Sequence, residues 1–401
     1  MEVRLAGAWT LTRYDALTGD ILTQPARVCD GTTRFSTVLS IHDSLLLKMT
    51  PVEAAQEAQP AKAASEPATG MATSAAGPLA GVDLSDPVPV TLSEPNVLLL
   101  DMAEFRLADG PWEPEEELLR IDTQLRKRLG LPLRMDAMVQ PWVLEASGNG
   151  VEASLAASDP AHRLTLRFHI RTEIPLPAPL LGLEHPEGNR IRLNGQEVAQ
   201  SDAGWFTDRC IRTVALPSLP AGIHVLELDT FLDRRYGLEW CYLLGDFGVR
   251  VDGRHKRVIE PVRSLAFGDW TTQGLPFYAG NVTYHCGFEG SGGSATLQAA
   301  QFTNPLLTVS VDGTPAGRIA WAPYRLTLGN MAPGPHSLDI TAFGNRFNAF
   351  GCVHLCNPAY TWFGTSCWRT VGLDWSYQYR LKPMGLLVAP TVGCEDPFPA
   401  I

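Results

Sequence analysis

An internal repeat in the second half of the chain is the feature that most constrains its fold. The segment IRLNGQEV at 191–198 parallels VSVDGTPAG at 309–317, and each reads as a strand that enters an Asn-Gly or Asp-Gly turn. Such dipeptides between apolar runs are the strongest local signal of a β-hairpin. Further along, 215–231 and 327–343 share one order: an apolar strand, a Pro/Gly turn, a histidine, and a second apolar strand that ends in Phe. This repetition predicts two copies of one β-sandwich.

The composition favours an all-β protein with several domains. The 401 residues include 36 Gly and 31 Pro, which supply many turns, while only 19% charged residues leave little material for long amphipathic helices. A chain of this length exceeds what one hydrophobic core usually serves. We place the two sandwiches at 145–262 and 263–401.

Two smaller parts are expected ahead of the sandwiches. Residues 1–50 contain a few strand-like runs, too few to close a core of their own, so a partial β-sandwich is expected there. Residues 51–90 begin with a stretch rich in Ala, Pro and Glu that buries too little apolar surface to offset its ordering entropy. They are predicted to form a disordered linker, with a weak helix over Val52–Gln59 as the alternative.

Residues 91–144 are expected to form a connector that contains one strand and the one helix of the chain. Asn96–Asp101 reads as a buried strand. Glu113–Gly130 is the expected helix, because acidic residues crowd its first turn, basic residues its last, and Gly130 supplies a stop. Its apolar stripe comprises Leu118, Leu119, Ile121, Leu125 and Leu129.

The run from Asp269 to Glu289 connects this pattern with a known family. Its side chains alternate from Val282 onward with a period of two, which predicts a half-buried strand. The run resembles the signature that opens the sugar-binding jelly-roll domain of glycoside hydrolase family 2, and more closely the related domains of family 106 rhamnosidase-like bacterial proteins. The matching residues are Trp270, Gly274, Pro276, Phe277, Tyr278, Gly280, Val282, Tyr284 and Phe288.

The resemblance implies tandem jelly rolls of the galactose-binding-like type, and a chain that is the C-terminal region of a longer enzyme or a descendant of one. In the resembled families the catalytic acid and nucleophile lie in a barrel, and this sequence lacks the βα units of a barrel. A non-catalytic role is therefore expected, in which the chain binds carbohydrate or braces an upstream catalytic domain. Two alternatives stay open: a glycosidase that uses an Asp/Glu pair, and a scaffold that binds other proteins.

Candidate sugar ligands follow from the chemistry of sugar recognition, in which an aromatic face stacks on the ring and planar polar groups bind its hydroxyls. The candidates in the first sandwich are Trp205, Asp208, Arg209, Glu239 and Trp240, and those in the second are Trp321, Tyr324, Arg346 and Asn348. Aromatic residues are more often core than ligand platform, so the loop residues among them are favoured. A catalytic pair would have to come from Asp208, Glu239 and Asp246.

Charge and cysteine usage limit the other partners. A net charge of −11 argues against binding to nucleic acid or to an anionic membrane. The sequence has no apolar run that could span a bilayer and no signal-peptide pattern at its start, so a cytoplasmic protein is expected, with export as part of a longer chain left open.

Cys352, His354 and Cys356 alternate along one segment, but they lack the C-x-x-C spacing of a zinc knuckle. Neither a metal nor another cofactor is expected.

Overall fold

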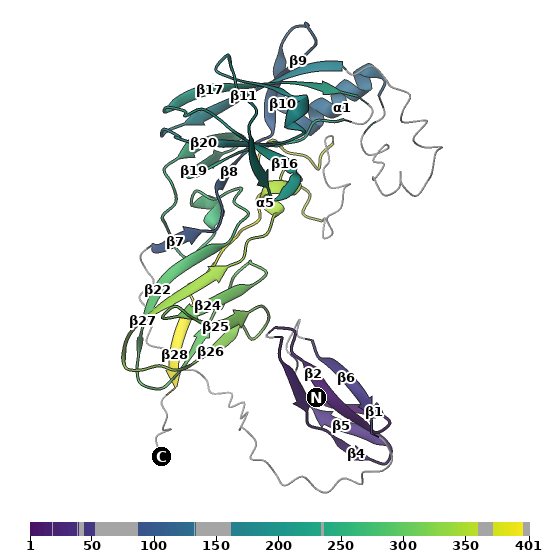
Figure 1. Cartoon of the computed structure of the whole chain (residues 1–401), viewed down its shortest axis with the longest axis vertical. Helices are drawn as coiled ribbons and strands as arrows, with labels where there is room; N and C mark the ends of the chain where they lie inside the picture. The colour runs from purple at the N-terminus through teal and green to yellow at the C-terminus, as the bar shows by residue number, and fades with distance from the viewer. Residues whose placement is uncertain are drawn as a thin grey trace.

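A computed structural model describes residues 1–52, 87–131, 133, 162–359 and 372–395, apart from Thr18, Val38, Ser40–Asp43 and residues 234–235 (Figure 1). The described chain consists mainly of antiparallel strands, which confirms the all-β fold class. Its α-helices are α1 (Leu118–Leu129) and the single turn α5 (Phe347–Phe350). Most of the predicted linker, residues 53–86, lies outside the described residues. No described helix is long and apolar enough to cross a bilayer.

The N-terminal part forms two three-stranded sheets with a small core. One sheet has the order β1 (Glu2–Ala6), β5 (Thr32–Ser36), β4 (Arg27–Cys29), and the other has the order β3 (Ile21–Gln24), β2 (Trp9–Tyr14), β6 (Leu46–Pro51). Among its described residues, the buried side chains are those of Leu11, Thr33 and Phe35. Leu22 and Met49 on the outer strands stay 50% and 40% exposed. Because each of these sheets has only three strands, much of the apolar surface of the N-terminal part stays exposed.

The first sandwich packs a long sheet against a five-stranded one. The long sheet has the order β10 (Glu113–Glu117), β9 (Met102–Leu107), β11 (His162–Thr172), β17 (Gly222–Leu232), β13 (Arg190–Leu193), β14 (Gln196–Glu197), with the hairpin of β19 (Gly248–Asp252) and β20 (His255–Ile259) joined to β11. The second sheet has the order β15 (Asp202–Phe206), β16 (Asp208–Ala215), β12 (Leu180–Glu184), β18 (Cys241–Gly245), β8 (Asn96–Leu100). The segment expected as a connector therefore contributes strands to both of these sheets.

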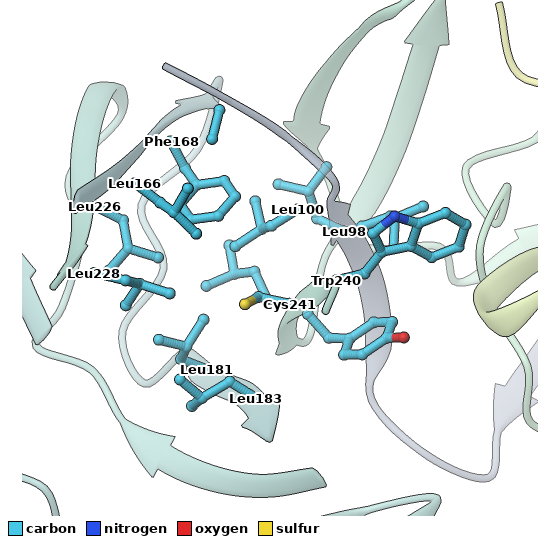
Figure 2. Packing of buried hydrophobic residues seen from close by; sticks show 14 of the residues in the cluster. Leu98, Leu100, Leu166, Phe168, Leu181, Leu183, Leu226, Leu228, Trp240 and Cys241 are labelled. Atoms are coloured by element: carbon cyan, nitrogen blue, oxygen red, sulfur yellow. The ribbon is translucent and has the colours of Figure 1, made fainter. Parts of the chain in front are cut away.

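Leucine pairs from the facing sheets fill the core of this sandwich. Leu166 of β11 and Leu228 of β17 belong to one buried cluster with Leu181 of β12 and Leu98 of β8 (Figure 2). Each of these side chains is at most 3% exposed. Complete burial of a leucine contributes about 1.5–3 kcal/mol, so this layer is a main source of the stability of the sandwich.

Helix α1 begins later than the sequence predicts. The acidic run Glu113–Glu117 is not helical but forms the edge strand β10, which pairs with β9. Glu117 caps the helix instead, because its carboxylate accepts hydrogen bonds from the backbone N–H groups of Leu119 and Arg120 at 3.1 and 3.0 Å. The predicted stop is correct, since Gly130 adopts the left-handed conformation with φ 72°.

The second sandwich has a six-stranded and a three-stranded sheet. The larger sheet has the order β21 (Ser264–Leu265), β7 (Val88–Leu92), β22 (Val282–Gly290), β27 (Gly334–Ala342), β24 (Leu307–Val311), β25 (Thr314–Ile319). The smaller has the order β26 (Arg325–Asn330), β23 (Ser294–Gln298), β28 (Thr391–Glu395). Trp270, Tyr278 and Tyr284 of the family-like run are fully buried in this core. The resembling residues are thus part of the scaffold.

The internal repeat is confirmed at the level of side-chain contacts. In the first sandwich, Asn194 of the β13–β14 turn contacts His224 Nδ1 at 3.1 Å, and His224 Nε2 contacts the carbonyl of Pro220 at 2.8 Å. In the second, Asp312 of the β24–β25 turn contacts His336 Nδ1 at 2.7 Å, and the other nitrogen contacts a carbonyl at 2.9 Å. One histidine therefore ties the hairpin turn to the start of the following long strand in each copy.

The chain beyond β27 returns to the first sandwich before it completes the second. We call residues 347–359 and 372–387 the C-terminal arm. Val353 of the arm is fully buried in the core of the first sandwich, and Leu386 in the core of the second. Phe350 of α5 also packs against Phe206 and Tyr242 of the first sandwich, with ring centroids 5.6 and 5.1 Å apart. The arm therefore joins the two cores.

Candidate functional site

Two hollows of the first sandwich meet at the turn that follows β12. The inner hollow, of about 140 Å³, lies between the ends of β12, β17 and β18 and is lined in part by His185, Asn189, Phe231, Tyr236 and Glu239. The outer hollow, of about 400 Å³, is lined in part by His185, Glu187, Asp202, Arg209 and Arg212. His185 lines both hollows. The turn that carries it is therefore the boundary that the two hollows share.

Hydrogen bonds within this turn fix its shape. His185 adopts a left-handed conformation with φ 48°, and the 3₁₀ turn Pro186–Gly188 follows it. The carbonyl oxygen of His185 accepts hydrogen bonds from the Gly188 backbone at 3.0 Å and from the Asn189 side chain at 2.8 Å. The imidazole Nδ1 lies 3.5 Å from the Glu187 carboxylate. The ridge between the hollows therefore has a defined backbone and an exposed charged rim.

Aromatic side chains form one wall of the inner hollow. The ring of Tyr236 meets those of His185 and Phe231 edge to face, with centroids 5.4 and 5.0 Å apart. Tyr236 is nevertheless 41% exposed, so part of its ring remains open to a ligand. An aromatic ring of this kind can stack on the apolar side of a sugar.

A buried ion pair of helix α1 holds the segment that carries Tyr236. Arg126 and Asp122 lie one turn apart with 2.7 Å between Nε and Oδ2, and both side chains are at most 3% exposed. Arg126 donates to the carbonyl oxygen of Tyr236 at 3.1 Å, and the backbone N–H of Leu238 donates to Asp122 at 3.0 Å. This ion pair thus holds the backbone on both sides of Gly237, in the segment that forms one wall of the inner hollow.

An exposed tryptophan, Trp205, does not itself line the outer hollow but is the cross-strand neighbour of a residue that does. Trp205 of β15 pairs across the strands with Arg212 of β16, so their side chains project from the same face of the sheet. Arg212 lines the hollow and forms an ion pair with Asp202. Trp205 is 54% exposed, and Arg209 has no ion-pair partner among the described residues. An exposed indole on the edge strand β15 and an available guanidinium on its neighbour β16 therefore lie in one hairpin.

Asp208 lies beside this site and does not line either hollow. Its carboxylate accepts a hydrogen bond from the backbone N–H of Cys210 at 2.9 Å, and this contact lowers the pKa of Asp208. A side-chain hydrogen bond with Asp208 raises the pKa of the Cys210 thiol. Asp208 is therefore an exposed carboxylate that stabilises the turn into β16.

The predicted candidates Trp240 and Asn348 are buried. Trp240 is 7% exposed, and its indole N–H donates to Glu117 Oε1 at 2.7 Å. The side-chain amide of Asn348 donates to the carbonyl of Lys382 and accepts from its N–H, both at 2.9 Å. Their polar groups are already bound within the protein, so we leave both residues out of the proposed site.

The candidates of the second sandwich lie outside both of these hollows. Arg346 forms an ion pair of 2.6 Å with Glu94. Tyr324 packs edge to face against Phe302, with centroids 5.3 Å apart, and Trp321 is half-buried in the same turn. Neither hollow of the first sandwich includes any of these residues.

Glu239 and Asp246 are too far apart to act as a glycosidase pair. They flank the two ends of β18, which has five residues. At about 3.3 Å per residue that strand alone spans about 13 Å, whereas glycosidase carboxyl groups lie roughly 5 to 9.5 Å apart. Asp246 is also engaged by Arg263 in an exposed ion pair. Glu239 remains a polar group of the inner hollow.

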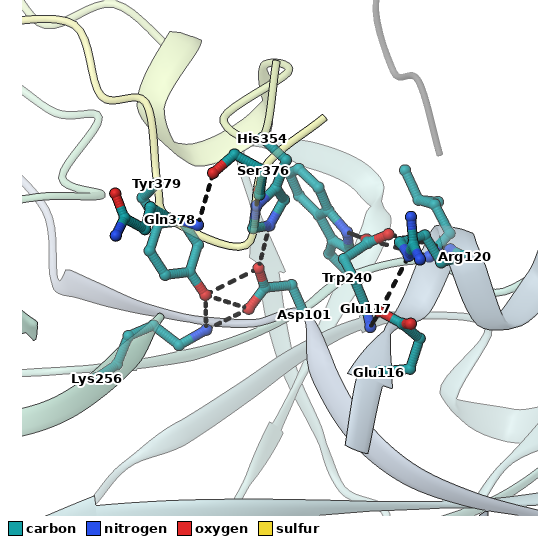
Figure 3. Close-up of polar contacts among 11 residues, drawn as sticks. Asp101, Glu116, Glu117, Arg120, Trp240, Lys256, His354, Ser376, Gln378 and Tyr379 are labelled. Carbon is teal, nitrogen blue, oxygen red and sulfur yellow. Dashed lines mark hydrogen bonds and ion pairs between the residues drawn. The ribbon is translucent and has the colours of Figure 1, made fainter. Parts of the chain in front are cut away.

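A buried cluster of titratable groups joins the C-terminal arm to the first sandwich (Figure 3). Asp101, which is fully buried, accepts hydrogen bonds from Tyr379 at 2.9 and 3.0 Å and forms an ion pair with Lys256. His354 Nε2 lies 2.9 Å from Asp101 Oδ2, and Nδ1 lies 2.8 Å from the carbonyl of Ser376. Both neighbours of His354 accept only, so both ring nitrogens carry protons and the imidazole is charged.

The pKa shifts agree with this assignment. Burial by itself lowers the pKa of His354, but the hydrogen bond and charge of Asp101 outweigh it and raise that pKa. Burial likewise acts to raise the pKa of Asp101, yet Lys256 and His354 together hold it well below its usual range. Burial raises the pKa of Glu117 to about 7. These are the shifts expected of an ion-pair network inside a protein.

The alternating side chains of Cys352, His354 and Cys356 are engaged in contacts within the protein. Both nitrogens of His354 are engaged, Cys352 is buried, and Cys356 Sγ lies 3.3 Å from the carbonyl of Leu373. Within the described part of the chain, no group of three or more His, Cys, Asp and Glu is placed to hold a metal ion.

Comparison with known proteins gives partial structural similarity. No protein-family model matches this chain, and neither does any curated protein. A rhamnosidase from Novosphingobium sp. PP1Y is similar over 60% of this chain and 26% of its own, at 18% identity and a TM-score of 0.24. A GH2 beta-galacturonidase from Eisenbergiella tayi is similar over 29% of this chain and 20% of its own, at 25% identity and a TM-score of 0.20.

A beta-D-mannosidase from Dictyoglomus thermophilum is similar over 62% of this chain and 31% of its own, at 15% identity and a TM-score of 0.21. These three neighbours are glycoside hydrolase chains, and the matched region spans less than a third of each. At such TM-scores, the function has to be inferred from the site itself.

Sequence reasoning missed His185 and Tyr236. The segment GLEHPEGNR could have indicated a tight turn after a strand, because Pro and Gly follow the histidine within three residues. Nothing local indicates that Tyr236 lies against that turn, since the contact joins residues 51 positions apart in the sequence.

Proposed function

We propose that this chain binds carbohydrate at the outer hollow of the first sandwich, with Trp205 and Arg209 as its principal contacts. The observation that supports this most is a 54% exposed indole whose cross-strand partner Arg212 lines the hollow together with Arg, Asp, Glu and His side chains. Sugars need both elements, because one face of the ring is apolar while the hydroxyl groups pair with planar polar groups.

The volume of the outer hollow agrees with such a ligand. About 400 Å³ lies within the range of roughly 300–1,000 Å³ that is typical of small-molecule sites. The polar groups of the hollow carry charges of both signs, which suits neutral hydroxyl groups better than a strongly charged ligand. Binding is expected to be weak, near millimolar, since a single exposed ring supplies most of the apolar contact.

The finer proposal is that the chain serves as a non-catalytic accessory region of a glycoside hydrolase. It rests on the resemblance of the Asp269–Glu289 run to family 2 and family 106 proteins, together with the separation of Glu239 from Asp246. Structural bracing is part of this role, because the arm and the family-like run both reach the two cores.

A glycan screen of the whole chain tests the proposal. Purified protein is applied to an array of plant and bacterial oligosaccharides, and hits are titrated by ligand-observed NMR. Binding of at least one glycan class that weakens in Arg209→Ala, and persists in the control Arg190→Ala, would support the site. Absence of binding across the array would contradict it. Turnover of nitrophenyl glycosides that is lost in Glu239→Gln would favour the glycosidase alternative.

A further inference from the structure

The inner hollow is too small to be a ligand site by itself. Its volume of about 140 Å³ falls below the roughly 300 Å³ at the lower end of ordinary small-molecule sites. It is nevertheless bounded by a half-exposed aromatic ring and by polar side chains. A site of this composition and size can hold one part of a ligand whose remainder lies elsewhere.

The position of His185 indicates where that remainder lies. Its side chain lines both hollows, and the turn it begins is the ridge between them. A ligand bound in the outer hollow can therefore continue across His185 into the inner hollow without passing through the body of the protein.

We infer that the ligand is an oligosaccharide of at least two rings, with one ring in the outer hollow beside Trp205 and the next in the inner hollow against Tyr236. This inference rests on the proposed function and specifies its ligand. Tyr236 supplies the stacking surface, and the side chains of Asn189 and Glu239 line the space around it.

The support beneath Tyr236 favours a binding role for the inner hollow. The buried pair Asp122–Arg126 forms hydrogen bonds with the backbone at Tyr236 and Leu238, so the segment that carries the exposed ring is anchored to helix α1. A ring held in place before binding loses little conformational entropy when a sugar stacks on it. Tyr236 is therefore expected to determine selectivity for ligand length.

Comparison of ligand lengths on the wild-type chain tests this directly. Isothermal titration would use the methyl glycosides of galactose, glucose, mannose and rhamnose, and disaccharides that end in each of these sugars. We expect one disaccharide to bind at least about tenfold more tightly than its own methyl glycoside. Tyr236→Ala should remove this gain while the affinity for the methyl glycoside stays unchanged, and Tyr377→Ala, outside both hollows, should retain it.

The outcomes separate this inference from the proposed function. Equal affinities for one-ring and two-ring ligands in the wild type would overturn the inference and leave single-ring binding at Trp205 standing. A tenfold gain that survives in a folded Tyr236→Ala variant would overturn it as well. If Tyr236→Ala fails to fold, the inference is tested by the wild-type comparison of one-ring and two-ring ligands and by the same comparison in Tyr236→Leu. If no sugar of either length binds, the proposed function itself fails.

Discussion

His354 Nε2 lies 2.9 Å from Asp101 Oδ2, and this contact joins the C-terminal arm to the start of β9 across 253 residues of sequence. Asp101 is fully buried and His354 is 4% exposed. Around them stand Lys256 of β20, Tyr379 of the arm, and Glu117 at the start of helix α1. The attachment of the arm therefore depends on the protonation of a buried network.

Stability should fall as the pH rises through neutrality. Folding raises the pKa of Glu117 from 4.5 to about 7, so between these two pH values the folded state holds more protons at Glu117 than the unfolded state does. The pKa of His354 is also raised, which adds to the difference in the same direction. Stability from such groups is fully present below the unfolded pKa and is lost as pH rises through the folded pKa. Calorimetry at pH 5, 6, 7 and 8 should show a falling Tm, and Glu117→Gln should flatten the slope. An unchanged slope in that variant would contradict the assignment.

Trp240→Phe should destabilise the protein without affecting sugar binding. The substitution removes the indole N–H that donates to the buried Glu117 carboxylate at 2.7 Å. At a pH above about 7, where Glu117 is ionised, loss of a hydrogen bond to a charged group costs about 1.5–3 kcal/mol. Urea unfolding measures this cost. A stable variant that no longer binds carbohydrate would instead show that Trp240 contacts the ligand.

Arg126→Ala and Arg128→Ala should differ strongly although both residues belong to the last turn of α1. Arg126 is paired with Asp122 in the core, and removal of one partner of a buried pair costs about 3–5 kcal/mol. Arg128 pairs with Glu113 at the surface with its side chain 58% exposed, where such pairs contribute about 0–1 kcal/mol. Equal losses in chemical denaturation would show that the buried pair does not support the Tyr236 segment.

Local patterns predicted much of the fold because hairpins depend on neighbouring residues. The Asn194-Gly195 and Asp312-Gly313 turns adopt the positive φ angles that such dipeptides favour. The histidines of the repeat could be read from the sequence as a motif, although their contacts with the turns could not. The start of α1 was misplaced, since an acidic run suits either a first helical turn or an exposed edge strand.

Long-range contacts explain what the sequence could not show. The strand predicted at Asn96–Asp101 is present as β8, but its pairing with β18 joins residues more than 140 positions apart in the chain. Trp240 looked like a ligand platform because nothing near it in the sequence reveals Glu117 as its partner. The two hollows are lined by several separate segments between Leu166 and Cys241 and could be found only once the sheets were assembled.

The most direct test is titration of the Trp205→Ala variant with the best glycan from the array. Trp205 is 54% exposed, so its removal should leave Tm within a few degrees. Loss of the stacking ring should cost about 1.5–3 kcal/mol, a large part of the roughly 4 kcal/mol available to a millimolar ligand, and binding should become undetectable. Full affinity in a folded Trp205→Ala variant would contradict the proposed carbohydrate site.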